Sequence, residues 1–156
     1  MRSRRTAPRS EPRVKIVADT NTVISGLIWS GPPRRVIEAA RSGIIIIYVS
    51  DPLLVELRGV LGRTKLARFL IQNGTTADEL FSEYISHTMQ IMAPLLPTPV
   101  SVDPDDDAVL ACAIAAQADA IVTGDDHLLR LNAYQGIPIL TATELLTLIT
   151  LPPASP

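Results

Sequence analysis

The 156-residue chain predicts an α/β fold, a three-layer α/β/α sandwich with a short central parallel sheet. Short β-branched segments alternate with longer helix-like segments, which is the order of βαβ units and of parallel sheets covered by helices on both faces. The composition agrees, because 47% of the residues are hydrophobic and 19% are charged. A chain of this length and composition suits one globular domain with a sizeable core.

The predicted strands are short apolar runs at residues 15–18, 44–49, 120–123 and 138–140. Helical patterns occupy residues 23–29, 33–42, 52–61, 65–72, 77–92, 105–117 and 143–148. Boundary residues support this division, since Gly43 follows one helix and Thr76 with Glu79 has the spacing of a capping box at the start of another. These boundaries fix where each acidic residue stands relative to the end of an element.

We expect one domain, residues 14–148, between two tails. Residues 1–13 are rich in Arg, Ser and Pro without periodicity, which predicts a disordered basic tail. Residues 149–156 are predicted to form a loose C-terminal tail, because their prolines cannot continue a helix. The charge is divided accordingly: the first 15 residues carry a net charge of +5 and the remainder carries −7.

The sequence argues against several classes of protein. No apolar run approaches the ~18 residues that a membrane-spanning helix needs, and no secretory signal is recognisable. The single cysteine, Cys112, cannot form an internal disulfide and is predicted to be a small core residue. We therefore expect a cytoplasmic protein that does not enter a membrane.

Two acidic residues follow predicted strands. Asp19 ends the first strand, and Asp125 comes just after the strand at residues 120–123. Because the carboxyl ends of parallel strands share one edge of the sheet, we expect both acids there. Their desolvation is costly unless a cation or strong hydrogen bonds compensate it, so they predict a site for a divalent metal. For Asp19 alone, a turn or capping role is equally consistent.

Two more acids are expected to join this pair. Asp107 lies in the first turn of a predicted helix and shares a face with the apolar residues three, four and seven positions later, so packing of that face should direct it to the same edge. Asp105 and Asp106 are rotated by about 100° per residue and are predicted to be N-terminal helix charges. Glu56 borders the buried stripe of the helix at residues 52–61, from which a carboxylate can reach inward.

These segments resemble the motifs of the PIN-domain nucleases, and within them the branch related to the toxins of type II toxin–antitoxin pairs. The likeness covers roughly residues 14–148. Asp19-Thr20-Asn21 resembles the opening signature of the family. The segments that resemble the later motifs are residues 55–57, which contain Glu56, residues 103–111, in which Asp107 is the last acid, residues 122–125 and residues 136–141.

The resemblance implies a metal-dependent endoribonuclease that hydrolyses phosphodiester bonds of RNA with Mg²⁺ or Mn²⁺. It also implies an antitoxin protein that holds the enzyme inactive. The residues that it implies as catalytic and metal-binding are Asp19, Glu56, Asp107 and Asp125. Asn21 and Thr123 would be auxiliary polar residues that position ligands or phosphate oxygens.

Basic residues between positions 34 and 68 are candidates for contacts with RNA. They are Arg34, Arg35, Arg58, Arg63 and Lys65. A solvated helix surface, or a surface that binds the antitoxin, is at least as consistent with their pattern. His127 stands where many relatives have a further acid, and we expect it to be a loop residue. A homodimer is also expected by resemblance, through helices at residues 85–92 or 145–151, although both segments could instead complete the core.

Two other functions compete with a nuclease. One is a PIN-fold module that has lost catalysis and binds RNA or protein; the retention of four costly acids argues against it. The other is a phosphatase-like enzyme that forms an aspartyl-phosphate. That chemistry usually needs a second Asp two positions after the first and a catalytic Lys, but Asn21 occupies the former position and no lysine follows Lys65.

Overall fold

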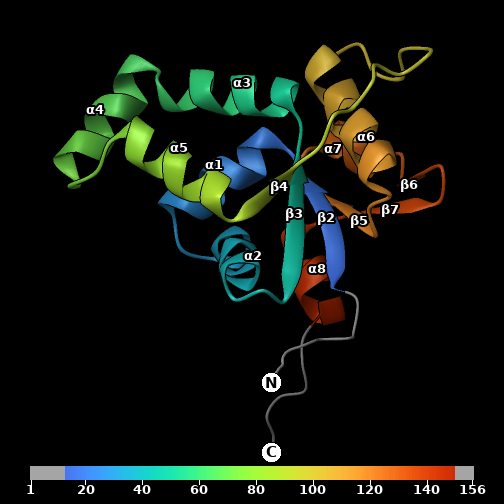
Figure 1. The fold of residues 1–156 in the computed structure, drawn as a ribbon, viewed down its shortest axis with the longest axis horizontal. Helices are drawn as coiled ribbons and strands as arrows, with labels where there is room; N and C mark the ends of the chain where they lie inside the picture. Colours follow the sequence, from blue (N-terminus) through green and yellow to red (C-terminus); the bar gives the residue numbers. More distant parts are fainter. Residues whose placement is uncertain (1–12, 150–156) are drawn as a thin grey trace, which may run out of the picture.

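The computed structural model describes residues 13–149, in which six strands form one sheet in the order β4-β3-β2-β5-β7-β6 (Figure 1). The strands are β2 (Val14–Ala18), β3 (Ile45–Val49), β4 (Thr88–Gln90), β5 (Ala120–Val122), β6 (Ala133–Tyr134) and β7 (Ile137–Leu140). The helices are α1 (Thr20–Ile28), α2 (Pro32–Arg41), α3 (Asp51–Leu61), α4 (Thr64–Gln72), α5 (Ala77–Ser86), α6 (Pro104–Ala116), α7 (Asp126–Leu129) and α8 (Ala142–Ile149).

The central strands run parallel, as predicted. β2 lies between β3 and β5, and the register places Ala18 opposite Val122. β4 and β7 extend the parallel arrangement on the two sides, whereas the two-residue strand β6 pairs antiparallel with β7. Ala18 and Val122 are the last residues of their strands, so the segments that follow them emerge side by side.

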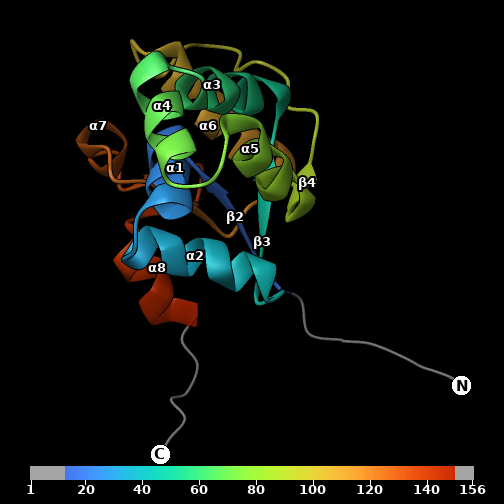
Figure 2. The same ribbon diagram turned by 90° about the vertical axis from the view of Figure 1, so that its left-hand side faces the viewer.

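Alternate residues of β2 contribute to two separate cores. Ile16 and Ala18 pack into the core that includes α1, α2, α3, α4, α5 and α8, while Val17 packs with Leu110 and Leu128 from α6 and α7. Helices therefore cover both faces of the sheet, which confirms the three-layer α/β/α prediction. Figures 1 and 2 show α3, α4 and α5 at one end of the molecule, above α2 and α8.

Helices α1 and α2 meet at a glycine. A Cβ atom added to Gly26 would lie 2.6 Å from the Pro33 carbonyl oxygen and 2.7 Å from Cγ1 of Ile37. A methyl group has no room at such distances, so the close approach of the two helices depends on the missing side chain. Pro33 also lines the pocket beside Asp19, which connects this packing to the acidic edge.

The prediction of one helix across residues 77–92 is wrong. Helix α5 ends at Ser86, and β4 then pairs with β3 at the edge of the sheet. The hydroxyl of Thr88 donates a hydrogen bond to the carbonyl of Ile85, 3.0 Å away, at this change of direction. A helix at residues 85–92 therefore cannot form a dimer surface. At the other expected surface, Leu145 and Leu146 are buried in the core, while Leu148 is 71% exposed.

Two short elements, α7 and β6, have no counterpart among the predicted segments. The predicted tails, residues 1–13 and 149–156, lie outside the described residues except for residues 13 and 149; residue 149 belongs to α8. Cys112 is fully buried, as predicted. Within residues 13–149, no helix is both long and apolar enough to cross a membrane.

Candidate metal centre

Asp19 lies directly after β2 and caps the start of α1. Its Oδ1 accepts a hydrogen bond from the amide of Thr22 at 3.1 Å, and its own amide donates to the carbonyl of Val122 at 3.2 Å. The side chain is only 8% exposed. The capping role and the position at the sheet edge are thus compatible, because the capping bond uses one carboxylate oxygen and leaves the other directed at the end of β5.

Thr123 connects Asp19 to Asp125. Its hydroxyl donates to Oδ2 of Asp19 at 2.7 Å and accepts a hydrogen bond from the amide of Asp125 at 2.9 Å. Thr123 is 1% exposed, so these bonds are shielded from water. Asp125 in turn caps α7, with Oδ1 accepting from the amide of His127 at 2.9 Å. The ends of β2 and β5 therefore hold two aspartates through one buried hydroxyl.

Glu56 reaches this edge from α3. The hydroxyl of Thr20 donates to its Oε1 at 2.5 Å. Burial raises the pKa of Glu56, the hydrogen bond from Thr20 opposes that rise, and the charge of Asp105, a hydrogen bond with Asp105 and the charge of Asp103 add to it. Glu56 therefore lies close to Asp105 and Asp103.

Asp106 is a buried acid of α6 that lies near the two aspartates at the strand ends. Burial raises the pKa of Asp106, and the negative charges of Asp125, Asp103 and Asp19 raise it further. Its side chain is 8% exposed and accepts a hydrogen bond from the hydroxyl of Ser101 at 3.2 Å. Asp106 lies in the first turn of α6, as expected for an N-terminal helix charge, but it is buried there.

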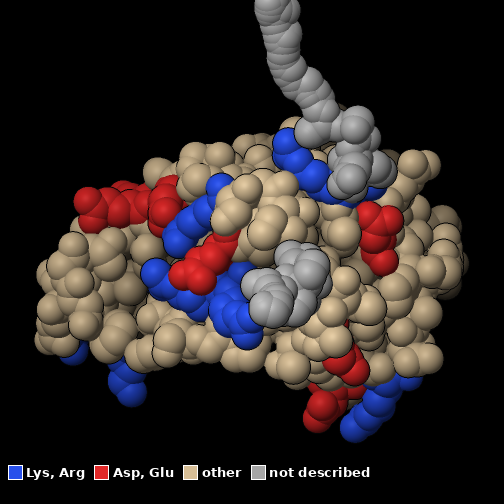
Figure 3. Space-filling view, turned by 90° about the horizontal axis from the view of Figure 1, so that it is seen from below, with Lys and Arg blue, Asp and Glu red and all other residues tan. Residues whose placement is uncertain are grey.

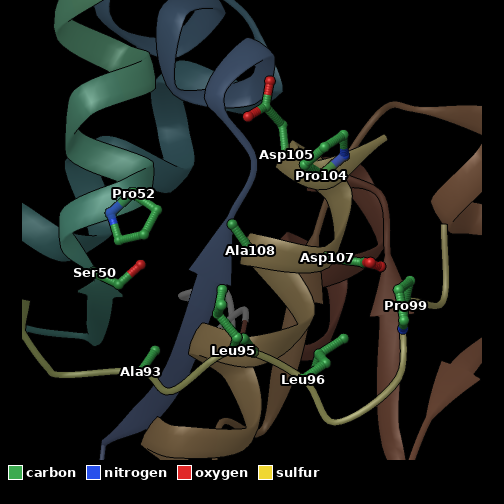
Figure 4. A pocket seen from close by; sticks show the side chains of 11 residues that line it. Ser50, Pro52, Ala93, Leu95, Leu96, Pro99, Pro104, Asp105, Asp107 and Ala108 are labelled. Atoms are coloured by element: carbon green, nitrogen blue, oxygen red, sulfur yellow. The ribbon is translucent and has the colours of Figure 1, made fainter. Parts of the chain in front are cut away.

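Asp107 is bound by the loop that precedes α6. Its carboxylate accepts hydrogen bonds from the amides of Val100, at 3.2 Å, and Ser101, at 2.8 Å, which fastens the preceding loop to α6. Figure 4 shows Asp105 and Asp107 leaving α6 in different directions, with Asp107 directed toward Pro99. The helical-phase argument did not predict these contacts of Asp107 with the loop.

Within residues 13–149, no lysine or arginine forms a salt bridge with the acids of this edge. The salt bridges there join Arg34 to Glu38 and Arg41 to Glu83, and the only one that involves the edge is the contact between His127 Nδ1 and Asp125 Oδ1 at 3.5 Å. Hard oxygen donors with excess negative charge are the ligands that Mg²⁺ and Mn²⁺ prefer, so the residues present fit such an ion. In the same range, no three Asp, Glu, His or Cys side chains already stand in a metal-binding arrangement.

A pocket of about 600 Å³ opens beside the acids. Its walls include Asp19, Asn21 and Asp125, together with His127 and Arg130 from the α7 segment. The predicted auxiliary residue Asn21 therefore lines this pocket. The other one, Thr123, is buried and does not line it. His127 belongs to α7 instead of a loop, and its side chain is 76% exposed.

The five basic residues expected to contact RNA lie elsewhere. None of Arg34, Arg35, Arg58, Arg63 and Lys65 lines the pocket beside Asp19. Some of them have partners of their own: Arg34 donates to the carbonyl of Leu27 at 3.3 Å, and Arg58 stacks 4.4 Å from the centre of the Phe81 ring. Figure 3 shows the face seen from below in Figure 1, on which Lys and Arg side chains lie beside Asp and Glu side chains.

Five residues near these acids were not among the predicted site residues: Thr20, Asp103, Asp105, Asp106 and Arg130. The acidic run at residues 103–107 is a visible signal, but it does not reveal which of its members face the sheet edge. Thr20 stands in the opening motif directly after Asp19, where the hydroxyl could have been considered as a partner for a neighbouring carboxylate. Nothing in the sequence singles out Arg130.

The fold and the acidic edge define an α/β domain of the PIN type. A family model for the PIN domain matches residues 15–127, and the chain belongs to this family. No curated protein matches the chain.

Nine chains of solved structures are similar to this one. Among them is a chain from the crystal structure of VapBC2 from Rickettsia felis bound to a DNA fragment from their promoter. The two chains are 16% identical in sequence, and their structures superpose with a TM-score of 0.56. The match covers 81% of this chain and 97% of the Rickettsia felis chain. This similarity establishes a shared fold.

Proposed function

We propose that this chain is a metal-dependent ribonuclease that hydrolyses RNA phosphodiester bonds and is the toxin of a toxin–antitoxin pair. The observation that carries the proposal is the convergence of Asp19, Asp106, Asp125 and Glu56 from four separate segments at the carboxyl edge of the sheet. Membership of the PIN-domain family supports the same activity.

Asp19, Asp106 and Asp125 would hold Mg²⁺ or Mn²⁺. Such an ion, when bound, lowers the pKa of a coordinated water and neutralises phosphate charge. Thr123 orients Asp19 through its hydroxyl and fixes the backbone of Asp125. These bonds hold the carboxylates in place before a ligand arrives, which reduces the cost of assembling the site.

Glu56 would accept a proton during hydrolysis. Its pKa is raised by burial, which makes it a better base at neutral pH than an exposed glutamate. Thr20 holds Oε1, so the hydrogen bond fixes one carboxylate oxygen of Glu56. Glu56 can also complete the ligand set.

An antitoxin partner is supported by the shared fold with a chain of the VapBC2 complex. That likeness concerns the backbone, so the partner of this chain and any homodimer are part of the proposal. Co-expression with the protein encoded by the adjacent gene, followed by size-exclusion chromatography, tests both assemblies.

An RNA cleavage assay tests the enzymatic part. The purified chain, freed of any inhibitor, should cut RNA with Mg²⁺ or Mn²⁺, and both EDTA and Asp19→Asn should abolish the cleavage. If the chain cuts no RNA with either metal, or if Asp19→Asn cuts equally well, the ribonuclease assignment is wrong. The alternative is then a PIN-fold module without catalysis that binds RNA or protein.

A further inference from the structure

Arg130 is the one arginine or lysine on the wall of the pocket beside Asp19 and Asp125. It is the C-cap residue of α7, and it is exposed to solvent. The part of the chain that the structure describes contains no salt bridge to the Arg130 side chain and no hydrogen bond from it. By contrast, Arg34 and Arg41 are occupied by Glu38 and Glu83.

The Arg130 side chain lacks a partner although acidic residues line the same pocket. Asp125 and Asp126 line the same pocket, yet neither forms a salt bridge with Arg130. A guanidinium group presents a rigid fork of donors that matches two oxygens of a phosphate. Across the pocket, Asn21 and Ser25 can donate further hydrogen bonds to an anion.

A second pocket, which shares His127 with the first, is of a different kind. This pocket of about 450 Å³ is lined by Asp106 and His127 and by apolar residues such as Val102 and Leu131. It contains no arginine or lysine, so it has no comparable group for phosphate binding. His127 borders both pockets. A strand that crosses the acids would therefore place a phosphate on the Arg130 side.

We propose that Arg130 binds a phosphate of the RNA strand next to the one that is hydrolysed, in the pocket formed with Asn21 and Ser25. The proposal rests on the proposed ribonuclease function. In this arrangement Arg130 is a substrate-binding residue that sets the position of the strand over Asp19 and Asp125. The contact is with the backbone, so it strengthens binding without selecting a base.

Binding and cleavage can be measured separately. A fluorescently labelled single-stranded RNA is titrated with the full chain in Ca²⁺, which occupies oxygen sites, and a gel checks that the RNA stays uncut. The variants are Arg130→Gln, Arg130→Lys and Arg68→Gln; the last removes the same charge from an exposed position on α4 outside the pocket. Thermal melting verifies that each variant is folded.

Arg130→Gln should weaken RNA binding by about tenfold, as expected for the loss of a charged hydrogen bond. It should also reduce the slope of log K against log salt by about 0.7, the value for one phosphate contact on a single strand. The RNA affinity of Arg130→Lys should lie between those of the unchanged chain and Arg130→Gln, because lysine keeps the charge but lacks the paired donors of the guanidinium group. Arg68→Gln should bind nearly as the unchanged chain does. In cleavage, Arg130→Gln should raise KM more than it lowers kcat.

The inference is overturned if Arg130→Gln and Arg68→Gln bind RNA equally, or if the unchanged chain shows no RNA binding. It is also overturned if Arg130→Gln weakens only the binding of a protein partner. The ribonuclease proposal fails separately: Arg130-dependent RNA binding without cleavage in Mg²⁺ or Mn²⁺ would refute the enzyme and retain the phosphate site.

Discussion

The hydroxyl of Thr123 donates a hydrogen bond to Oδ2 of Asp19 across 2.7 Å, although 104 residues separate them in the chain. The pairing of β2 with β5 brings the two residues together. The same hydroxyl accepts a hydrogen bond from the amide of Asp125. One buried side chain therefore fixes both aspartates that follow these strands. The arrangement of the acidic edge therefore depends on a residue that need not contact metal or RNA.

Thr123→Val should reduce both stability and cleavage. The substitution preserves the shape of the side chain but removes the donor to Asp19 and the acceptor for Asp125, and both groups are poorly hydrated. We expect the free energy of unfolding to fall by about 1–3 kcal/mol. Urea denaturation measures this loss. Thr123→Ser keeps the hydroxyl and should retain most of the stability and activity; equal losses for Ser and Val would show that packing is decisive.

The stability of the metal-free chain should fall as the pH rises. The pKa values of Asp106 and Glu56 are raised in the folded state by burial and by neighbouring acids. Unfolded carboxylates lose their protons near about pH 4. Above that pH the folded state therefore binds more protons than the unfolded state does. The contribution of Asp106 and Glu56 to the free energy of unfolding is fully present below their unfolded pKa values. It is lost as the pH rises through their folded pKa values.

Melting temperatures in EDTA from about pH 4 to 7 check this behaviour. Asp106→Asn serves as the comparison, because it removes one of the two groups and keeps an acceptor for Ser101. The variant should show a smaller decline with pH than the unchanged chain. Parallel curves for the two proteins would contradict the proximity of Asp106 to Asp19 and Asp125.

Glu56→Gln should separate stability from catalysis. The amide keeps an oxygen for the Thr20 hydroxyl and removes the charge that lies near Asp105 and Asp103. The metal-free melting temperature should stay level or rise, whereas kcat for RNA cleavage should drop by about 10²–10⁴, the range for loss of a general base. A variant with full activity would exclude Glu56 from the proton transfer.

Gly26→Ala should destabilise the fold by about 1–3 kcal/mol, because its Cβ would meet the backbone of Pro33. Gly59→Ala is the matched control in α3, where a Cβ meets nothing within 4 Å. There the same substitution should stabilise the chain by up to about 1 kcal/mol, because alanine favours a helix more than glycine does. Chemical denaturation measures both; a neutral Gly26→Ala would contradict the close packing of α1 on α2.

The positions of Asp19 and Asp125 could be predicted from the sequence because each follows a short β-branched run. In a parallel sheet the carboxyl ends of neighbouring strands share one edge, and this rule needs no side-chain detail. The edge strand β4 could not be predicted in the same way. Apolar residues continue through Ile85 and Met92, and only the pairing with β3 ends the helix at Ser86.

The choice between Asp106 and Asp107 could not be made from helical phase. Such an argument assumes that one apolar stripe faces the sheet, but residues 109–113 of α6 are all buried. A helix enclosed on nearly all sides has no single apolar face, so its rotation is undetermined by pattern. In the structure the amides of Val100 and Ser101 bind Asp107, whereas Asp106 is buried.

The central claim is that Asp19, Asp106 and Asp125 form the metal site, and a Mn²⁺ titration of thermal stability tests it most directly. Asp106→Asn and Asp107→Asn are compared, since they make the same change at adjacent positions. At about 100 times the Kd, an ion that binds the folded state adds about 2.7 kcal/mol, or several degrees of melting temperature. The unchanged chain and Asp107→Asn should show this rise, and Asp106→Asn should lose most of it. No rise in the unchanged chain, or an equal rise in Asp106→Asn, would contradict the proposed site.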